Sequence, residues 1–379
     1  MNTKGVSIMK NEKLEKGLSY SLKQVDRLMN DFPNSYPADQ STNYVYPEGN
    51  GNSWTEGFWP GMLNLAYEFT HDAKYQTAAE HEVQIFKKRI DNQISVEHHD
   101  LGFLYTPSCV AAWKLYHDED AKAAAVEAAN TLLRRFRPIG GFLQAWGPMD
   151  DDPKNYRLII DCMLNIPLLF WATEATGDPK YREHALSHLN ASVQNVIRKD
   201  YTTYHTFYFD PKTGAPDRGV THQGYSDNSI WARGQAWGIY GLALSYHYTH
   251  DPALLPLYRG VTQVFIDKLP KDKVPFWDMI FTDGDDQPRD SSSAAIAICG
   301  ILEMEKYESH PELKRQAEQM TESLIDHYLT ERIPESNGIL TDGMYSRPNG
   351  HEPECNIWGD YFFMEALMRL KNPDWKMYW

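Results

Sequence analysis

Two aspartates in this 379-residue chain stand where a carboxyl group could transfer a proton. Asp161 lies between Leu158-Ile159-Ile160 and Cys162-Met163-Leu164, and such an apolar setting raises a carboxyl pKa toward neutrality. Asp100 precedes a second apolar helix, and we expect it to face Asp161 so that the pair holds one proton between them. A lone aspartate at a helix start is more often an N-cap. Two of them on adjacent inner helices, among His and Trp residues, favour catalysis.

Aromatic and polar side chains that could bind a sugar occur in the same short segments. The chain contains 11 Trp and 23 Tyr, whose rings stack on sugar faces while their polar edges stay solvated. Arg233 is the best candidate to pair with a substrate carboxylate, although its alternative is a structural ion pair with an aspartate such as Asp227. The candidate substrate-binding residues are Trp54, Trp146, His205, His222, Gln223, Trp231, Arg233, Trp237 and Tyr345.

The histidines could also suggest a metal site. The sequence has no HExxH or comparable ligand spacing, and its four cysteines show no CxxC pair. Hydrogen bonding to substrate oxygens is the role we expect for the histidines. We predict neither a metal nor another cofactor.

A repeated unit of two helices must position these residues. Each copy begins with a polar or Gly-rich segment, continues as an apolar helix, breaks at a short polar turn and resumes as an amphipathic helix. The six starts, spaced by roughly 45 to 70 residues, fall at 54–59, 100–103, 161, 233–237, 290–293 and 357–360.

The sequence therefore predicts an all-α fold, an (α/α)6 barrel of six helix hairpins that forms one domain over residues 1–379. The first helix of each pair is apolar nearly all round and belongs inside, and the second belongs outside. Leu14, Leu18, Leu22, Val25 and Leu28 follow a helical spacing, so we expect residues 1–30 to supply the outer helix that closes the ring. An open helical solenoid shares the periodicity and is the alternative.

Closure would bring every inner helix start to the same mouth, where free N–H groups and helix dipoles favour an anion. The net charge of −15 and the absence of a long Lys/Arg run argue against binding of nucleic acid or an anionic membrane surface. We expect a small acidic oligosaccharide as the partner, a monomer or weak homo-oligomer, and a reduced cytoplasmic location without a signal peptide or membrane span.

Several motifs in one order resemble the unsaturated glucuronyl hydrolases of glycoside hydrolase family 88, from about Trp54 to Leu370. The motifs are His98-His99-Asp100-Leu101-Gly102-Phe103-Leu104-Tyr105, Gln144-Ala145-Trp146-Gly147, Ile159-Ile160-Asp161-Cys162 with Asn165, Tyr204-His205-Thr206-Phe207-Tyr208, Thr221-His222-Gln223-Gly224, Arg233-Gly234-Gln235-Ala236-Trp237-Gly238 and Arg289-Asp290-Ser291-Ser292.

The resemblance implies a hydrolase that acts on unsaturated uronyl disaccharides and oligosaccharides released by glycosaminoglycan lyases. Asp161 would be the general acid/base and Asp100 its essential neighbour. His205, His222, Gln223 and Arg233 would contact the unsaturated uronate, while Trp54, Trp146, Trp231, Trp237 and Tyr345 would line the pocket. The implied reaction is hydration of the C4–C5 vinyl ether, without a covalent nucleophile.

Three alternatives share the fold. One is an unsaturated rhamnogalacturonyl hydrolase that acts on pectin fragments, and another is a non-catalytic sugar-binding protein. A sugar epimerase is disfavoured because that class depends on histidine pairs. Glu352 and Glu354 should repel a sulfate, so we expect non-sulfated substrates to be preferred.

Overall fold

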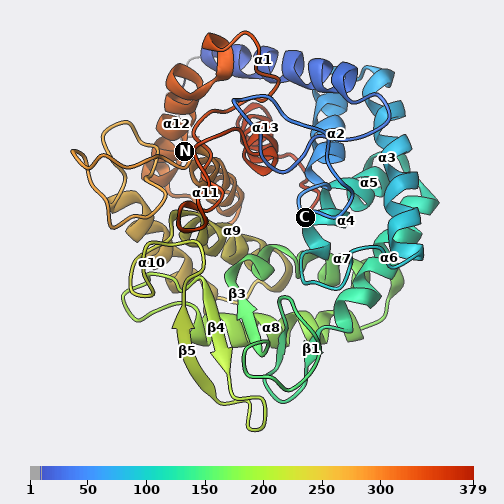
Figure 1. Cartoon of the computed structure of the whole chain (residues 1–379), viewed down its shortest axis with the longest axis vertical. Helices are drawn as coiled ribbons and strands as arrows, with labels where there is room; N and C mark the ends of the chain where they lie inside the picture. The colour runs from blue at the N-terminus through green and yellow to red at the C-terminus, as the bar shows by residue number, and fades with distance from the viewer. Residues whose placement is uncertain (1–8, 10) are drawn as a thin grey trace, which may run out of the picture.

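The apolar helices of this protein form the inner wall of a ring and the amphipathic helices form its outer wall. The structure, a computed structural model, describes Met9 and residues 11–379. Within these residues, six inner and six outer helical segments form an (α/α)6 barrel (Figure 1). The inner wall is made of α2 (Phe58–Thr70), α4 (Leu101–Tyr105) with α5 (Ala111–Tyr116), α7 (Pro167–Thr176), α9 (Ala232–Thr249), α11 (Ser291–Met304) and α13 (Ile357–Lys371). The outer wall is made of α1 (Asn11–Asp31), α3 (Ala73–Asp91), α6 (Glu119–Leu133), α8 (Lys180–Asn195), α10 (Leu254–Asp267) and α12 (Pro311–Ser323).

The ring closes between its first and last elements. Helix α13 packs against both α11 and α2, and α1 covers α13 and α2 from outside (Figure 1). Of the five residues that predicted this outer helix, Leu14, Leu18, Val25 and Leu28 are buried and Leu22 is partly buried. The closed ring is therefore confirmed over the open solenoid. The part of the prediction that covers residues 1–8 and 10 lies outside the described residues.

A short polar turn reverses the chain after four of the inner helices. His71, His117, Gly177 and His250 each adopt the left-handed conformation at the helix end, which stops the helix. The next residue in each case is an aspartate whose carboxylate accepts a backbone N–H of the following helix, as in the bond from Lys74 N to Asp72 Oδ1 at 3.0 Å. These turns explain the repeat that the sequence shows.

Two inner segments depart from regular α-helix. A π-helical stretch, Thr106–Val110, separates α4 from α5, and a 3₁₀ helix, Ile160–Leu164, precedes α7. Asp161 lies in this 3₁₀ segment, so it stands before the apolar α-helix rather than at its start. Both departures occur beside the two predicted catalytic aspartates, which is where irregular helical turns often carry function.

A small sheet leads into the mouth. Strand β3 (Arg157–Ile159) pairs antiparallel with β4 (Thr206–Phe209), which pairs with β5 (Pro216–Val220). A separate hairpin joins β1 (Phe136–Arg137) to β2 (Phe142–Leu143). Asp161 follows β3, His205 precedes β4 and His222 follows β5, so the sheet brings three separate segments to one place.

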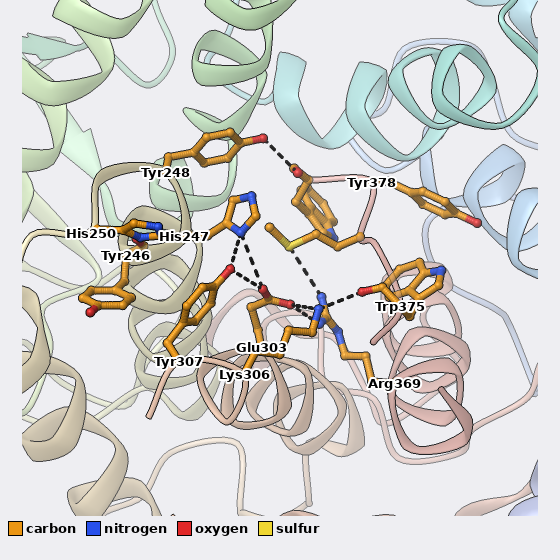
Figure 2. Close-up of polar contacts among 12 residues, drawn as sticks. Tyr246, His247, Tyr248, His250, Glu303, Lys306, Tyr307, Arg369, Trp375 and Tyr378 are labelled. Carbon is orange, nitrogen blue, oxygen red and sulfur yellow. Dashed lines mark hydrogen bonds and ion pairs between the residues drawn. The ribbon is translucent and has the colours of Figure 1, made fainter. Parts of the chain in front are cut away.

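The opposite end of the barrel is filled by a buried ionic cluster and by residues 375–379. Figure 2 shows Arg369 beside Glu303 at this end, where the two side chains form an ion pair. The Arg369 guanidinium also contacts Glu365 and donates to Tyr240 Oη at 2.6 Å. The Trp379 ring stacks on Phe362 at 5.8 Å. Polar groups and rings thus occupy this end, where they leave a pocket of about 650 Å³ lined in part by Lys114, His247 and Glu303.

Among the described residues, the structure contains no helix long and apolar enough to traverse a bilayer.

The Arg369 cluster yields a stability prediction. The Arg369→Met substitution leaves Glu303 and Glu365, which are 1% and 0% exposed, without their shared cation. We expect it to lower the free energy of unfolding by about 3–5 kcal/mol, since an uncompensated buried charge is costly. The matched control is Arg315→Met, which breaks the exposed pair with Glu312 and should barely change the urea midpoint. Equal midpoints for the two variants would contradict the prediction.

Candidate active site

The carboxylate of Asp100 lies at the mouth close to ring nitrogens of His98, His99 and Trp146. It is 5% exposed, and its oxygens lie 3.3 Å from His98 Nδ1, 3.3 Å from His99 Nε2 and 3.4 Å from Trp146 Nε1. Asp100 occupies the N-cap position of α4, yet its side chain makes no capping hydrogen bond. The simple capping role therefore does not account for it.

The carboxyl group of Asp161 differs from Asp100 in having a buried oxygen without a partner. Oδ1 is buried and accepts no hydrogen bond, although the residue as a whole is partly exposed. Burial and the negative charge of Asp100 raise the pKa of Asp161 to about 7, against an opposing effect of Arg233. For Asp100, burial acts to raise the pKa, but His99 and His98 outweigh it and hold the pKa below its usual value. Near neutral pH the pair thus holds one proton, which resides on Asp161.

Another buried aspartate shows why the raised pKa alone does not mark a site. Burial also raises the pKa of Asp360 to about 7. Its oxygens, however, accept the backbone N–H groups of Ile339 and Leu340 at 3.0 and 2.8 Å and the hydroxyl of Tyr46 at 3.0 Å. Asp360 is therefore a structural group. Of these two aspartates, Asp161 is the one that combines a raised pKa with a buried oxygen that has no hydrogen-bond partner.

Asn165 connects the segments that carry the two aspartates. Its Nδ2 donates to the Asp161 carbonyl at 3.2 Å, and its Oδ1 accepts the Phe103 N–H at 2.8 Å. Gly102 permits this approach, because a Cβ there would lie 2.3 Å from Asn165 Cα. The two helix starts are consequently held in a fixed relation to each other.

A pocket of about 360 Å³ opens beside Asp100. Four of the predicted residues line it, namely Trp54, Asp100, Trp146 and Tyr345. Trp54 Nε1 donates to Tyr345 Oη at 3.0 Å, which fixes both rings on one wall. The sequence prediction missed Asp39, Asn50, Asn52 and Ser53, which also line this pocket. The Gly-Asn-Gly-Asn-Ser run before Trp54 was the signal that could have revealed three of them.

His205 and His222 lie at the ends of two paired strands, because His205 precedes β4 and His222 follows β5. His205 Nδ1 accepts the backbone N–H of His222 at 3.0 Å, so its ring proton resides on Nε2. Burial holds the pKa of His205 well below its usual value, and the ring contacts Trp231 at 4.3 Å. His205 is thus a neutral donor with a fixed tautomer. His222 is exposed at the rim, as its position on the loop after β5 requires.

Arg233 is buried in a network rather than free to form a forked pair with a ligand. It donates to Asp290 Oδ2 at 3.1 Å and to the carbonyl oxygens of Met344 and Tyr345 at 2.5 and 2.7 Å. The prediction of a direct forked pair is therefore corrected, because protein acceptors take its donors and its aspartate partner is Asp290 rather than Asp227. Arg233 also donates to Gln223 Oε1 at 2.7 Å. Because this bond occupies the amide oxygen, the amide nitrogen of Gln223 is the atom that can donate to a ligand.

Trp237 also differs from its prediction. It is 0% exposed, and its ring lies against Phe103 at 5.2 Å and Phe362 at 5.5 Å. It supports the pocket from behind instead of lining it, because it points into the aromatic interior of the ring. Asp161 is likewise not among the residues that line the 360 Å³ pocket, although the charge of Asp100, which lines it, acts on Asp161.

Across Met9 and residues 11–379, no group of three or more His, Cys, Asp and Glu side chains could hold an ion.

A helical barrel with an asymmetric pair of carboxyl groups and aromatic walls at one mouth defines the class of sugar-processing (α/α)6 enzymes. Comparison with known proteins identifies the family. Residues 21–372 match Glycosyl Hydrolase Family 88. The chain belongs to this family and is a glycoside hydrolase, which confirms the resemblance seen in the sequence.

Curated relatives and solved structures agree with this assignment. An unsaturated chondroitin disaccharide hydrolase of Streptococcus agalactiae serotype III (strain NEM316) is 48% identical over 372 residues, which cover 97% of this chain and 93% of the relative. A crystal structure of an unsaturated glucuronyl hydrolase from Streptococcus agalactiae has a TM-score of 0.96 at 46% identity, covering 99% of this chain and 95% of that one. An aspartate-to-asparagine mutant of that enzyme, complexed with dGlcA-GalNAc6S, has a TM-score of 0.88 at 43% identity with the same coverage.

The raised pKa of Asp161 predicts a pH-dependent stability. Between its usual pKa of 3.8 and about 7 the folded protein holds a proton that the unfolded chain releases, so stability falls as the pH rises through this window. Each pH unit in this window lowers the free energy of unfolding by about 1.4 kcal/mol. The Asp161→Asn variant does not have this loss. We expect its urea midpoint to exceed that of the wild type more at pH 8 than at pH 4.

The control for this measurement is Asp360→Asn. That substitution places an amide NH2 group among backbone N–H donors, so we expect it to destabilise the protein at both pH values. A pH-independent difference between Asp161→Asn and the wild type would rule out a raised pKa at residue 161.

Proposed function

We propose that this enzyme hydrolyses unsaturated uronyl disaccharides and oligosaccharides of the kind that glycosaminoglycan lyases release. The observation that carries the proposal is the Asp161 carboxyl group, protonated near neutrality and with one oxygen unpartnered, beside the ionised Asp100. The names of the relatives support the substrate class, since they are unsaturated chondroitin disaccharide or unsaturated glucuronyl hydrolases. An inverting or retaining glycosidase would instead use two carboxyl groups at the glycosidic bond itself.

In the proposed reaction, Asp161 donates its proton to C4 of the C4–C5 double bond, and positive charge develops at C5 and the ring oxygen. The nearby Asp100 carboxylate favours that charge. Water then attacks C5 while Asp161 takes back a proton, which restores the acid and leaves a hemiketal. The C5–O5 bond breaks to give a ketone at C5 and a hemiacetal at C1. The hemiacetal breaks down and releases the remaining saccharide.

The same geometry assigns roles in binding. The Gln223 amide, oriented by Arg233, and the Nε2–H of His205 are the donors we propose for the uronate, with Arg233 adding positive charge from behind. His222 is proposed as a further contact at the rim. Trp54, Trp146 and Tyr345 would stack on the sugars, while Trp231 supports His205.

Of the two glutamates expected to repel a sulfate, one is held by hydrogen bonds to a loop. Glu354 accepts the backbone N–H groups of Asn43 and Tyr44 at 2.7 Å each and the hydroxyl of Ser41 at 2.5 Å, so it anchors a loop. Glu352 is exposed and forms an ion pair with Arg347. The proposed preference therefore rests on Glu352 alone.

The test is an absorbance assay for loss of the conjugated double bond with unsaturated disaccharides of the chondroitin, hyaluronan and rhamnogalacturonan types. Turnover of the first two supports the proposal, and exclusive turnover of the third would favour the pectin-directed activity. Binding without turnover of any of them would indicate a sugar-binding protein and overturn the proposal.

The Asp161→Asn variant should lose about 10²- to 10⁴-fold in kcat, because it cannot donate the proton. The control is Asp251→Asn, a change of the same atoms in the turn before α10 on the far side of the barrel, where an asparagine oxygen can also accept the Ala253 N–H. Activity of Asp161→Asn within threefold of the control would refute the assignment of residue 161.

The pH dependence follows from the same group. Because protonated Asp161 is the reactive form, kcat/KM should fall tenfold per pH unit above about 7 and stay level on the acidic side until Asp100 is protonated. A rate profile that remains level up to pH 9 would contradict this mechanism.

We further propose that residues 1–379 act as one catalytic domain, as a monomer or weak homo-oligomer, because one chain supplies every residue of the site described. The four cysteines are buried and free, which supports a reducing, cytoplasmic location.

A further inference from the structure

A row of alternating cations and aromatic rings leads from the pocket across the sheet to the surface. Arg157 on β3, Tyr208 on β4 and Arg218 on β5 are direct neighbours in the strand register, so their side chains share one face. The Arg157 guanidinium lies 5.3 Å from the centre of the Trp146 ring and 5.7 Å from that of Tyr208, and the Arg218 guanidinium lies 4.7 Å from Tyr208. We call these four residues the ladder.

The ladder begins at the catalytic pair. Trp146 lines the 360 Å³ pocket, and its Nε1 contacts the Asp100 carboxylate. Ile159 and Thr206 are paired in the sheet and lie close in sequence to Asp161 and His205. Arg157 lies two residues farther along β3, or about 7 Å from Ile159. Figure 1 shows the β4–β5 hairpin projecting from the edge of the ring, so a saccharide that leaves the pocket on this side would pass along it.

The ladder also has unused capacity for an anion. Arg157 Nε is buried and has no hydrogen-bond partner, while its Nη1 donates to the Lys154 carbonyl. The Arg218 side chain is 58% exposed and pairs only with its neighbour Asp217, itself 49% exposed. Such an exposed pair is weak, so a multivalent acidic ligand can compete with it.

We propose that the ladder is a distal subsite that binds an anionic group on the leaving part of an acidic oligosaccharide. The arginines supply the charge, and Trp146, which lines the pocket, supplies a flat surface for a sugar face. The Tyr208 ring is 8% exposed and lies against both guanidinium groups, so it holds them in a row. The anion is either a carboxylate on the third sugar or a sulfate on the second. This inference rests on the proposed function and adds to it a preference for longer acidic substrates. For a sulfated disaccharide, the attraction of the ladder would oppose the repulsion proposed for Glu352.

The experiment compares kcat/KM for three substrates, namely the unsaturated hyaluronan disaccharide, the unsaturated hyaluronan tetrasaccharide and the 6-sulfated unsaturated chondroitin disaccharide. The readout is kcat/KM for the tetrasaccharide or the sulfated disaccharide, divided by kcat/KM for the hyaluronan disaccharide. The fraction of folded enzyme cancels in this ratio. Arg218→Gln should lower at least one ratio about three- to tenfold, as expected for loss of an exposed charge-assisted contact. Arg157→Gln should lower the same ratio further.

The matched control is Lys212→Gln, which removes one positive charge from the β4–β5 turn beyond the ladder. Its ratios should equal those of the wild type. A fall confined to the tetrasaccharide identifies the carboxylate, and a fall confined to the sulfated disaccharide identifies the sulfate.

Two outcomes separate the possible failures. If the wild type turns over the substrates but Arg218→Gln leaves both ratios within twofold of the wild type, the ladder is not a subsite and the proposed function stands. If the wild type turns over none of the three substrates, the proposed function itself fails.

Discussion

The apolar faces of the inner helices are buried only when the ring closes, and this constraint organises the rest of the protein. Closure places the starts of all the inner helices at one end, although they are far apart in the chain. Asp100 and Asp161 lie on consecutive inner segments at this end, and burial together with the negative charge of Asp100 raises the pKa of Asp161. The reactive state of Asp161 is thus a property of the closed barrel, not of its local sequence.

The two ends of the barrel differ in how their buried polar groups are paired. At the end that carries residues 375–379, the charge of Arg369 compensates those of Glu303 and Glu365. Trp379 Nε1 donates to Glu365 Oε2 at 2.8 Å. At the mouth, by contrast, Oδ1 of Asp161 is buried without a partner. A folded protein satisfies most buried polar atoms, so an unsatisfied one beside a pocket is a sign of function.

Fixed hydrogen bonds at the mouth decide which atoms face a ligand. The His222 amide sets the tautomer of His205, and Arg233 sets the orientation of the Gln223 amide. Asn165 holds the Asp161 turn against the helix that follows Asp100. These supporting contacts reduce the reorganisation that the transition state would otherwise require.

The sequence by itself determined the helix pairs, their inner and outer roles and the two aspartates, because apolar periodicity and turn residues act locally along the chain. It also contained the family motifs, and with them the class of reaction. It could not show that Arg233 is occupied by Asp290, that Trp237 lies behind the pocket or that Arg157 lies between Trp146 and Tyr208. Those facts depend on contacts between segments tens of residues apart, which only the tertiary structure decided.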